Sequence, residues 1–383
     1  MRKRSLMVLS VILVLAFVLA SCGGAAASSA PPAASTPAST AAASSEADSS
    51  GDGVAAVDHE PFSVDIYSWS TGSFTYVIGM AWAELINKYS PWLTAVCVEA
   101  PSNLANELMM YDAHDKRENT VYYAVGDAAY RGVEEFEGKQ NTRSKMVANF
   151  GLTINGLVTC DPNIKTIDDL SGKTMLVRAP MSALNLYWQT IFSELNPEVK
   201  FEPMDMTQSV EALLGNRAAT FFLPSFAMDD TFTTWAPNAA GAELLSRATT
   251  VNFINSPAEA INKLRNEPGG RYENYWTCAV TVPALAVDPR QTEPWDVFMN
   301  NGAFFADEDM DDEVVYEMVR VVAEHYKDLS DYHPQAGLVN PETLAIYAGP
   351  VDMHPGALKC FDDFGVTPIA MDVYAADFIS KAV

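Results

Sequence analysis

The sequence predicts an α/β fold divided into two lobes. From about residue 61 onward, short runs rich in β-branched and aromatic residues alternate with stretches of helical periodicity, which is typical of strand–helix units around a parallel sheet. This body of roughly 320 residues is longer than one hydrophobic core usually supports, so we expect two compact lobes. The body contains no apolar run long enough to suggest a membrane span.

The first 21 residues have the features of a lipoprotein signal peptide. A basic stretch at Arg2–Arg4 precedes an apolar run from Leu6 to Leu19, and "LASC" ends that run at Cys22. Small residues before a cysteine suit cleavage ahead of Cys22, and two or more acyl chains there would anchor the protein stably. We therefore expect a mature protein held through Cys22 at the extracytoplasmic face of the cell membrane. The alternative is an ordinary signal peptide in which the cysteine is incidental.

Residues 22–60 comprise the lipidated cysteine and a disordered tether in this interpretation. Ala, Ser, Pro, Thr and Gly dominate the segment, so few side chains could offset the entropy of ordering it. The whole chain has 24 basic and 49 acidic residues and a net charge of −25. Such a charge disfavours nucleic acid or an anionic lipid surface as the main partner.

Strands and helices can be assigned along the first part of the body. "FSVDIYSW" (62–69), "LTAVCVEA" (93–100) and "NTVYYAVG" (119–126) are predicted strands, and each is followed by a loop and a helix start. The carboxyl ends of parallel strands meet at one edge of a sheet, where α/β proteins commonly bind ligands. We therefore expect the three loops to lie together at a binding edge.

The remaining chain repeats this pattern. "INGLVTC" (154–160) is a predicted crossing strand, "IDDLSGKTMLVRAP" (167–180) a short helix, a turn and a strand, and a helix should begin at Ser182. A helix and a strand ending near Leu223 follow within 206–227. The predicted elements closing the body are an apolar strand in "WDVFMNNGAFFA" (295–306) and a long helix that begins with acidic residues at 311–313.

At this point the chain resembles a known family. "STGSFTYVIGMAWAEL", "LANELM", "VGDAAY", "IDDLSGKTMLV", "DEDMDDEVVYEMV" and "MHPGALKCFDDFGV" resemble, in order, segments of the TAXI group, extracytoplasmic solute receptors of tripartite ATP-independent periplasmic (TRAP) transporters. The resemblance implies a two-lobed fold like periplasmic binding proteins of type II, with two doubly wound α/β domains joined by crossing hinge segments. Lobe I would be 61–158 plus 296–383 and lobe II 159–295, with hinges near 157–161 and 290–296.

The resemblance also implies a function. A small organic solute, such as glutamate or another amino acid or a dicarboxylate, would be captured between the lobes and passed to TRAP membrane subunits by a monomeric receptor that does no covalent chemistry. A ligand-presenting sensor for a signalling protein is an alternative reading, and an extracellular hydrolase is a third.

Candidate ligand contacts lie where helices begin, because free backbone N–H groups and the helix dipole there favour carboxylates. In lobe I these are the first loop, with Ser70, Thr71, Gly72, Ser73 and Tyr76, followed by Asn103 and Asp127. In lobe II they are Arg178, Ser182 and Ser225. Capping and packing are the competing roles for most of these side chains. Trp69, Phe74 and Trp188 would make the site more apolar if they reach it rather than the core.

The second lobe departs from the family at its anion-binding loop. TAXI receptors typically have Gly-Ser-Gly-Thr before this helix, whereas the chain has "MSALN" and keeps only Ser182. Arg178 stands where a small residue is usual. Its guanidinium could pair with a carboxylate in a bidentate manner, or be an exposed cation at a strand end.

Motifs of metal, cofactor and enzyme sites do not fit. His354 precedes Pro355 and Gly356 without a second histidine at ligand spacing, which favours a structural corner. The acidic run from Asp307 resembles a calcium loop but lacks its glycine and its final carboxylate. "GKT" at 172–174 precedes a strand, so it reads as a turn rather than a phosphate loop. The body cysteines, which lack zinc-ligand spacing, are better read as buried free thiols than as a disulfide: Cys97, Cys160, Cys278 and Cys360.

Overall fold

The computed structural model describes residues 59–379, apart from positions 72, 126, 179, 181 and 268–276. The chain divides into two units, Met1–Val57 and Asp58–Val383, and the second holds all the elements below. The predicted signal peptide, Cys22 and the tether up to residue 58 lie outside the described residues. No helix in the described part is long and apolar enough to span a membrane.

Lobe I is built on strands that fall where the sequence predicts them. β1 (Phe62–Tyr67) pairs in parallel with β2 (Leu93–Val98) and with β3 (Thr120–Ala124). β11 (Trp295–Asp307) then runs antiparallel to β3, and β4 (Ser144–Thr159) pairs with β11. The order is therefore β2-β1-β3-β11-β4.

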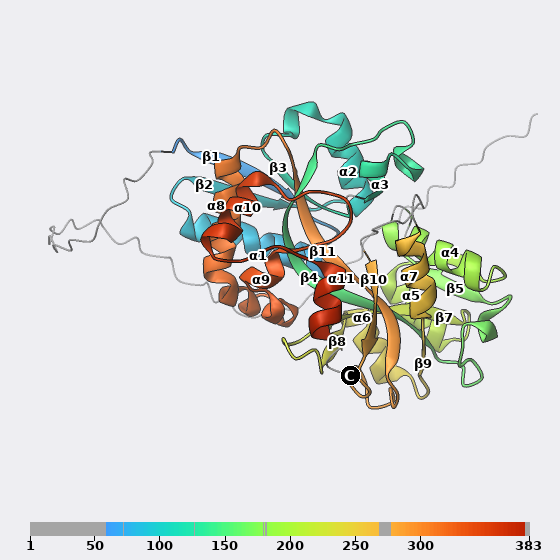
Figure 1. The fold of residues 1–383 in the computed structure, drawn as a ribbon. Coiled ribbons are helices and arrows are strands. Elements are labelled where there is room, and N and C mark those ends of the chain that lie inside the picture. The colour runs from blue at the N-terminus through green and yellow to red at the C-terminus, as the bar shows by residue number, and fades with distance from the viewer. Residues whose placement is uncertain are drawn as a thin grey trace, which may run out of the picture. The chain divides into compact units, whose positions relative to one another are not determined.

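Lobe II repeats this arrangement with other strands. β6 (Lys200–Pro203), β5 (Thr174–Val177) and β7 (Thr220–Ala227) are parallel neighbours, and β4 runs antiparallel to β7. Each lobe thus places three parallel strands beside one long antiparallel strand. β4 and β11 belong to both halves, so one hydrogen-bonded sheet runs through the body (Figure 1). The predicted two-lobed α/β class is confirmed.

Helices and minor strands complete the body. In lobe I and the C-terminal part these are α1 (Phe74–Tyr89), α2 (Asn103–Asp112), α3 (Asp127–Arg131), α8 (Asp312–His325), α9 (Pro341–Leu344), α10 (Pro355–Asp363), α11 (Met371–Tyr374), β12 (Ile346–Tyr347) and β13 (Ile369–Ala370). In lobe II they are α4 (Ala183–Leu195), α5 (Met206–Leu214), α6 (Ala239–Arg247), α7 (Ala258–Asn266), β8 (Trp235–Pro237), β9 (Asn252–Ile254) and β10 (Thr277–Val282). Short 3-10 and π turns link them.

Two hydrophobic cores support the halves, and the two long strands pass from one to the other. Along β4, Phe150 belongs to the core of lobe I and Leu152 to the core of lobe II; along β11, Met299 belongs to lobe II and Ala303 to lobe I. By core membership the crossings lie at Gly151 and at 300–302. The boundaries predicted from the sequence, 158/159 and 295/296, lie later on β4 and earlier on β11 than these crossings, and they stay a prediction.

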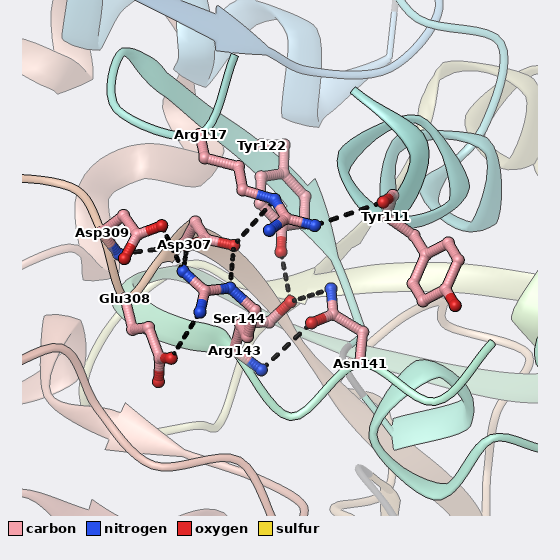
Figure 2. Close-up of polar contacts among 9 residues, drawn as sticks. All are labelled: Tyr111, Arg117, Tyr122, Asn141, Arg143, Ser144, Asp307, Glu308 and Asp309. Atoms are coloured by element: carbon pink, nitrogen blue, oxygen red, sulfur yellow. Dashed lines mark hydrogen bonds and ion pairs between the residues drawn. The ribbon is translucent and has the colours of Figure 1, made fainter. Parts of the chain in front are cut away.

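An ion network around the buried carboxylate of Asp307 fastens the lobe I ends of the crossing strands (Figure 2). The guanidinium of Arg143, just before β4, donates to Asp307 at 2.7 Å and to Glu308 at 2.9 Å, and also pairs with Asp309. Asp307 ends β11 and is 2% exposed, and Arg117 approaches it at 3.5 Å. The acidic run that resembles a calcium loop is thus neutralised by arginine.

Helix starts and turns agree with several sequence expectations. Asp311 caps α8, and His354 caps α10 immediately before Pro355. Gly172 adopts a φ of +69°, which suits the predicted turn before β5. The four body cysteines are free, and Cys278 and Cys360 are buried. The strand predicted to end near Leu223 continues to Ala227, because Pro224 is accommodated between β4 and β8.

Candidate ligand-binding site

A cleft of about 890 Å³ lies where the two halves of the body meet. Its lining comes from the first loop and α1 of lobe I, the crossing strands β4 and β11, and the strand ends and helix starts of lobe II. This is near the upper end of the usual range for small-molecule sites, roughly 300–1,000 Å³. The topology predicts a site here, because the helices that follow parallel strands begin at this edge.

Five of the described helix starts contribute their cap residue to the cleft lining. Four of these caps are occupied: Ser73 accepts from the N–H of Tyr76, Ser102 from that of Ala105, Asp205 from that of Gln208, and Asn238 from that of Gly241. The fifth, Ser182 before α4, makes no capping hydrogen bond. Ser182 is 4% exposed, and its hydroxyl has no hydrogen-bond partner among the described residues. The start of α4 therefore keeps unused hydrogen-bonding capacity.

Arg178 brings a positive charge to the same place. It follows β5, and Asn185 of α4 holds its backbone by accepting from its N–H at 2.9 Å and donating to its carbonyl at 2.7 Å. The guanidinium carbon lies 4.7 Å from the ring centre of Trp69 and 5.7 Å from that of Phe222. These contacts are of cation–π type.

Among the described residues, none neutralises the charge of Arg178. Within the described residues, no carboxylate forms an ion pair with it, and its Nε is buried without a hydrogen-bond partner. Burial lowers the pKa of Arg178, but an arginine side chain stays protonated in proteins. A half-buried cation whose Nε has lost its contact with water without gaining a partner is unfavourable, and an anionic ligand would supply that partner.

Apolar side chains form much of the remaining wall. Phe74 of α1 packs against Phe226 of β7 with ring centres 4.9 Å apart, so the two lobes touch across the cleft. His333 lies against Phe74 at 5.4 Å, and burial lowers the pKa of its imidazole, which favours the neutral form. Burial also raises the pKa of Tyr123 to about 12, so its phenol stays protonated.

Two asparagines from the crossing strands lie together at the cleft. Asn155 of β4 donates to the side-chain oxygen of Asn300 of β11 at 2.6 Å, and both residues belong to the lining. The side-chain oxygen of Asn155 is buried and has no donor among the described residues. The crossing therefore offers the cleft a buried acceptor.

The structure brings half of the predicted site residues into the cleft lining: Ser70, Thr71, Ser73, Arg178 and Ser182. Three described residues are not part of that lining. Tyr76 faces elsewhere on α1, Asn103 is buried in the first turn of α2, and Ser225 is buried in β7 between two residues that do line the cleft. Gly72 lies outside the described residues. Asp127 is the first residue of α3 rather than its cap, and its side chain is outside what the structure describes.

Sequence reasoning missed the contributions that depend on tertiary pairing. Trp69 and Phe74 reach the cleft, as considered from the sequence, whereas Trp188 is in the core of lobe II. The sequence analysis did not predict that the Asn155–Asn300 pair or residues between Phe226 and Asn238 line the cleft. For the pair, the sequence did contain a signal, because Asn155 and Asn300 are polar residues inside otherwise apolar strands.

The sequence of this chain matches a known family over most of its length. The sequence pattern of the NMT1-like family matches residues 68–365, which covers both lobes and every element of the cleft. The chain belongs to the NMT1-like family. That family is of the periplasmic solute-binding type, a broader group than the TAXI receptors that the sequence motifs resemble. No curated protein matches the NMT1-like chain.

Solved structures similar to this NMT1-like protein are distant in sequence. The malate-bound protein MatC from Rhodopseudomonas palustris is 10% identical, with 84% of this chain and 97% of that chain covered and a TM-score of 0.46. An adipate-bound protein of the same organism is 13% identical, with 84% and 96% covered and a TM-score of 0.44. The periplasmic sulfonate-binding protein SsuA of a putative ABC transporter from Methylobacillus flagellatus is 14% identical, with 71% and 70% covered and a TM-score of 0.41.

Proposed function

We propose that this protein is a membrane-anchored extracytoplasmic receptor that captures a small organic carboxylate between its lobes and delivers it to a TRAP-type secondary transporter. The observation that carries the carboxylate assignment is Arg178, a half-buried cation in the cleft with a buried Nε and no ion-pair partner among the described carboxylates. Pairing with a ligand carboxylate would give this group the bidentate contact that arginine makes best.

The start of α4 supports the same assignment. Arg178 and Ser182 flank the turn into α4, and Asn185 ties the two ends of that turn together. An anion held here would meet the guanidinium, the unused hydroxyl of Ser182 and the positive end of the helix dipole. All three contributions favour an anion at the start of α4.

The two-lobe construction supports capture by closure. Phe74 and Trp69 of lobe I reach Phe226 and Arg178 of lobe II, so a ligand at Arg178 would be enclosed by residues from both halves. In the described sheet the lobes are connected only through β4 and β11, which can act as hinges. The core of lobe II also includes a few residues of the lobe I half, among them Leu104 and Ala129. The proposed anchor on Cys22 rests on the signal-peptide pattern that ends in "LASC". The proposed TRAP partner rests on the resemblance to TAXI receptors.

A thermal-shift screen of the purified protein tests the receptor function. A ligand that binds only the folded state must raise the melting temperature, by an amount that grows with ligand concentration. We expect carboxylates to raise it in the wild type and to lose most of this effect in Arg178→Ala. Arg217→Ala is the matched control, because Arg217 is exposed and does not line the cleft. Equal shifts in both variants, or no shift with any acid, would contradict the proposal.

A further inference from the structure

The charges of the cleft lining restrict the kind of acid that fits. Among the described lining residues, the side chains that carry charge near neutral pH are Arg178 and Asp205, since burial keeps His333 neutral. A second carboxylate on the ligand would therefore find no second cation. Burying an unpaired charge is strongly unfavourable, so a dicarboxylate gains little from this site.

The surroundings of Arg178 define how one carboxylate would bind. The guanidinium carbon of Arg178 lies 4.7 Å from the ring centre of Trp69 and 5.7 Å from that of Phe222. The N–H groups at the edge of the guanidinium can pair with a carboxylate in the same plane. Ser182 can donate to the same carboxylate at the start of α4. One carboxylate would thus use the donors of both Arg178 and Ser182.

The rest of the lining suits an apolar body. Apolar side chains from both lobes contribute to the wall: Phe74, Phe150, Leu184, Met204, Met206, Phe226 and Met228. In a cleft of about 890 Å³, an acid of only a few carbon atoms would leave most of this wall in contact with water. The unpaired oxygen of Asn155 would repel a further carboxylate and accept from a hydroxyl.

Asp205 does not serve the ammonium group of an amino acid well. It is exposed to solvent, one of its oxygens already caps α5, and it forms no ion pair with Arg178. An α-amino acid carries both charges on one carbon, so its ammonium would have to lie beside the half-buried guanidinium. Like charges at that distance repel.

We propose, resting on the receptor function above, that the cleft selects a monocarboxylate with an extended apolar body, in preference to a dicarboxylate or an α-amino acid. The carboxylate pairs with the edge of Arg178 and with Ser182, and the apolar body fills the aromatic and methionine-lined part of the cleft.

Calorimetric titration of the purified protein with ligands that share one body tests this. 3-Phenylpropanoate is compared with its uncharged amide, with benzylmalonate, which adds a carboxylate, and with L-phenylalanine, which adds an ammonium group. We expect 3-phenylpropanoate to bind at least about tenfold more tightly than each of the others, because each of them either lacks the charged hydrogen bond to Arg178 or leaves a charge unpaired. Straight-chain acids from butanoate to octanoate should bind about fourfold more tightly per buried methylene.

Two variants separate the contacts from general damage. Ser182→Ala should weaken 3-phenylpropanoate about tenfold while leaving the melting temperature unchanged or higher, because it removes a buried hydroxyl without a partner. Arg217→Ala, at an exposed residue outside the cleft lining, should leave the affinity for 3-phenylpropanoate within about twofold.

The outcomes distinguish the two proposals. The dicarboxylates benzylmalonate and glutarate and the amino acid L-phenylalanine decide the ligand class. If one of them binds as tightly as 3-phenylpropanoate, and Arg178→Ala abolishes this binding, the proposed preference for a monocarboxylate is wrong while the receptor function stands. The preference is also wrong if Asp205→Asn abolishes binding of L-phenylalanine, because Asp205 then holds its ammonium group. If no acid in either series binds, the receptor function itself fails.

Discussion

The imidazole of His354 lies at the start of α10, fully buried between that helix, α8 and β4. Its Nδ1 accepts from the N–H of Gly356 at 3.3 Å, so its proton is on Nε2, and the backbone N–H of His354 donates to the carbonyl of Met146 at 2.8 Å. Burial lowers its pKa, and this outweighs the opposing effect of the Asp312 carboxylate, whose oxygen lies 3.5 Å from Nδ1; Lys145 lowers the pKa a little further. The ring is therefore a neutral cap.

This neutral cap predicts a pH-dependent stability. Because the folded pKa lies below the ordinary value, the unfolded chain binds the proton first as pH falls, so stability is full above about pH 6.5 and is lost as pH falls through the folded pKa. We expect the free energy of unfolding in urea to fall less between pH 8 and pH 5 in His354→Asn, which keeps a cap but does not titrate. His333 titrates in the same direction in both proteins. Parallel pH profiles would show that His354 is not the group responsible.

At the scale of elements, the crossing of β4 and β11 contains two glycines with different surroundings. A Cβ on Gly151 would lie 2.9 Å from Cε1 of Phe74, whereas a Cβ on Gly302 would meet nothing closer than the carbonyl oxygen of Gly151 at 3.7 Å. Phe74 forms the wall of the cleft against Phe226 of the other lobe. A methyl group at 151 therefore displaces a residue that joins the lobes, and one at 302 does not.

These surroundings predict different effects for a matched pair of substitutions. Gly151→Ala should lower the free energy of unfolding by about 1 kcal/mol and weaken ligand binding, because Phe74 must move. Gly302→Ala should stay within about 0.5 kcal/mol of the wild type and retain its affinity. Urea unfolding and the thermal-shift assay measure both. A Gly302→Ala protein that loses binding while Gly151→Ala keeps it would exclude this account of the crossing.

The elements also show what the sequence could and could not predict. β1 and β2 alternate, and β3 is a short run of β-branched and aromatic residues, so the positions of these strands and the site residues after β1, such as Ser70 and Ser73, were predictable from local pattern. The N-terminal half of β4 was missed because the strand is buried almost throughout and shows no alternation. The pairing of Asn155 with Asn300, and the stacking of Trp69 on Arg178, join segments far apart in sequence, which no local pattern records.

At the scale of the whole molecule, charge and anchoring are linked. The chain has a net charge of −25, so an anionic membrane surface repels the body rather than holding it. A basic protein that lost its lipid could still adhere through lysine and arginine, but this one has no such contribution. The proposed lipid on Cys22 would then be the main attachment to the membrane. Without it, nearly all of the protein should leave the membrane.

Cell fractionation tests this attachment. We expect Cys22→Ala to move most of the protein from the membrane fraction to the soluble extracytoplasmic fraction, with little change on raising salt, because no electrostatic attraction remains to be screened. Cys97→Ala, a change at a half-buried cysteine of the body, should leave the protein in the membrane fraction. If Cys22→Ala stays with the membrane, the apolar segment Leu6–Leu19 is retained as the anchor, and the receptor is held by an uncleaved signal segment instead of a lipid.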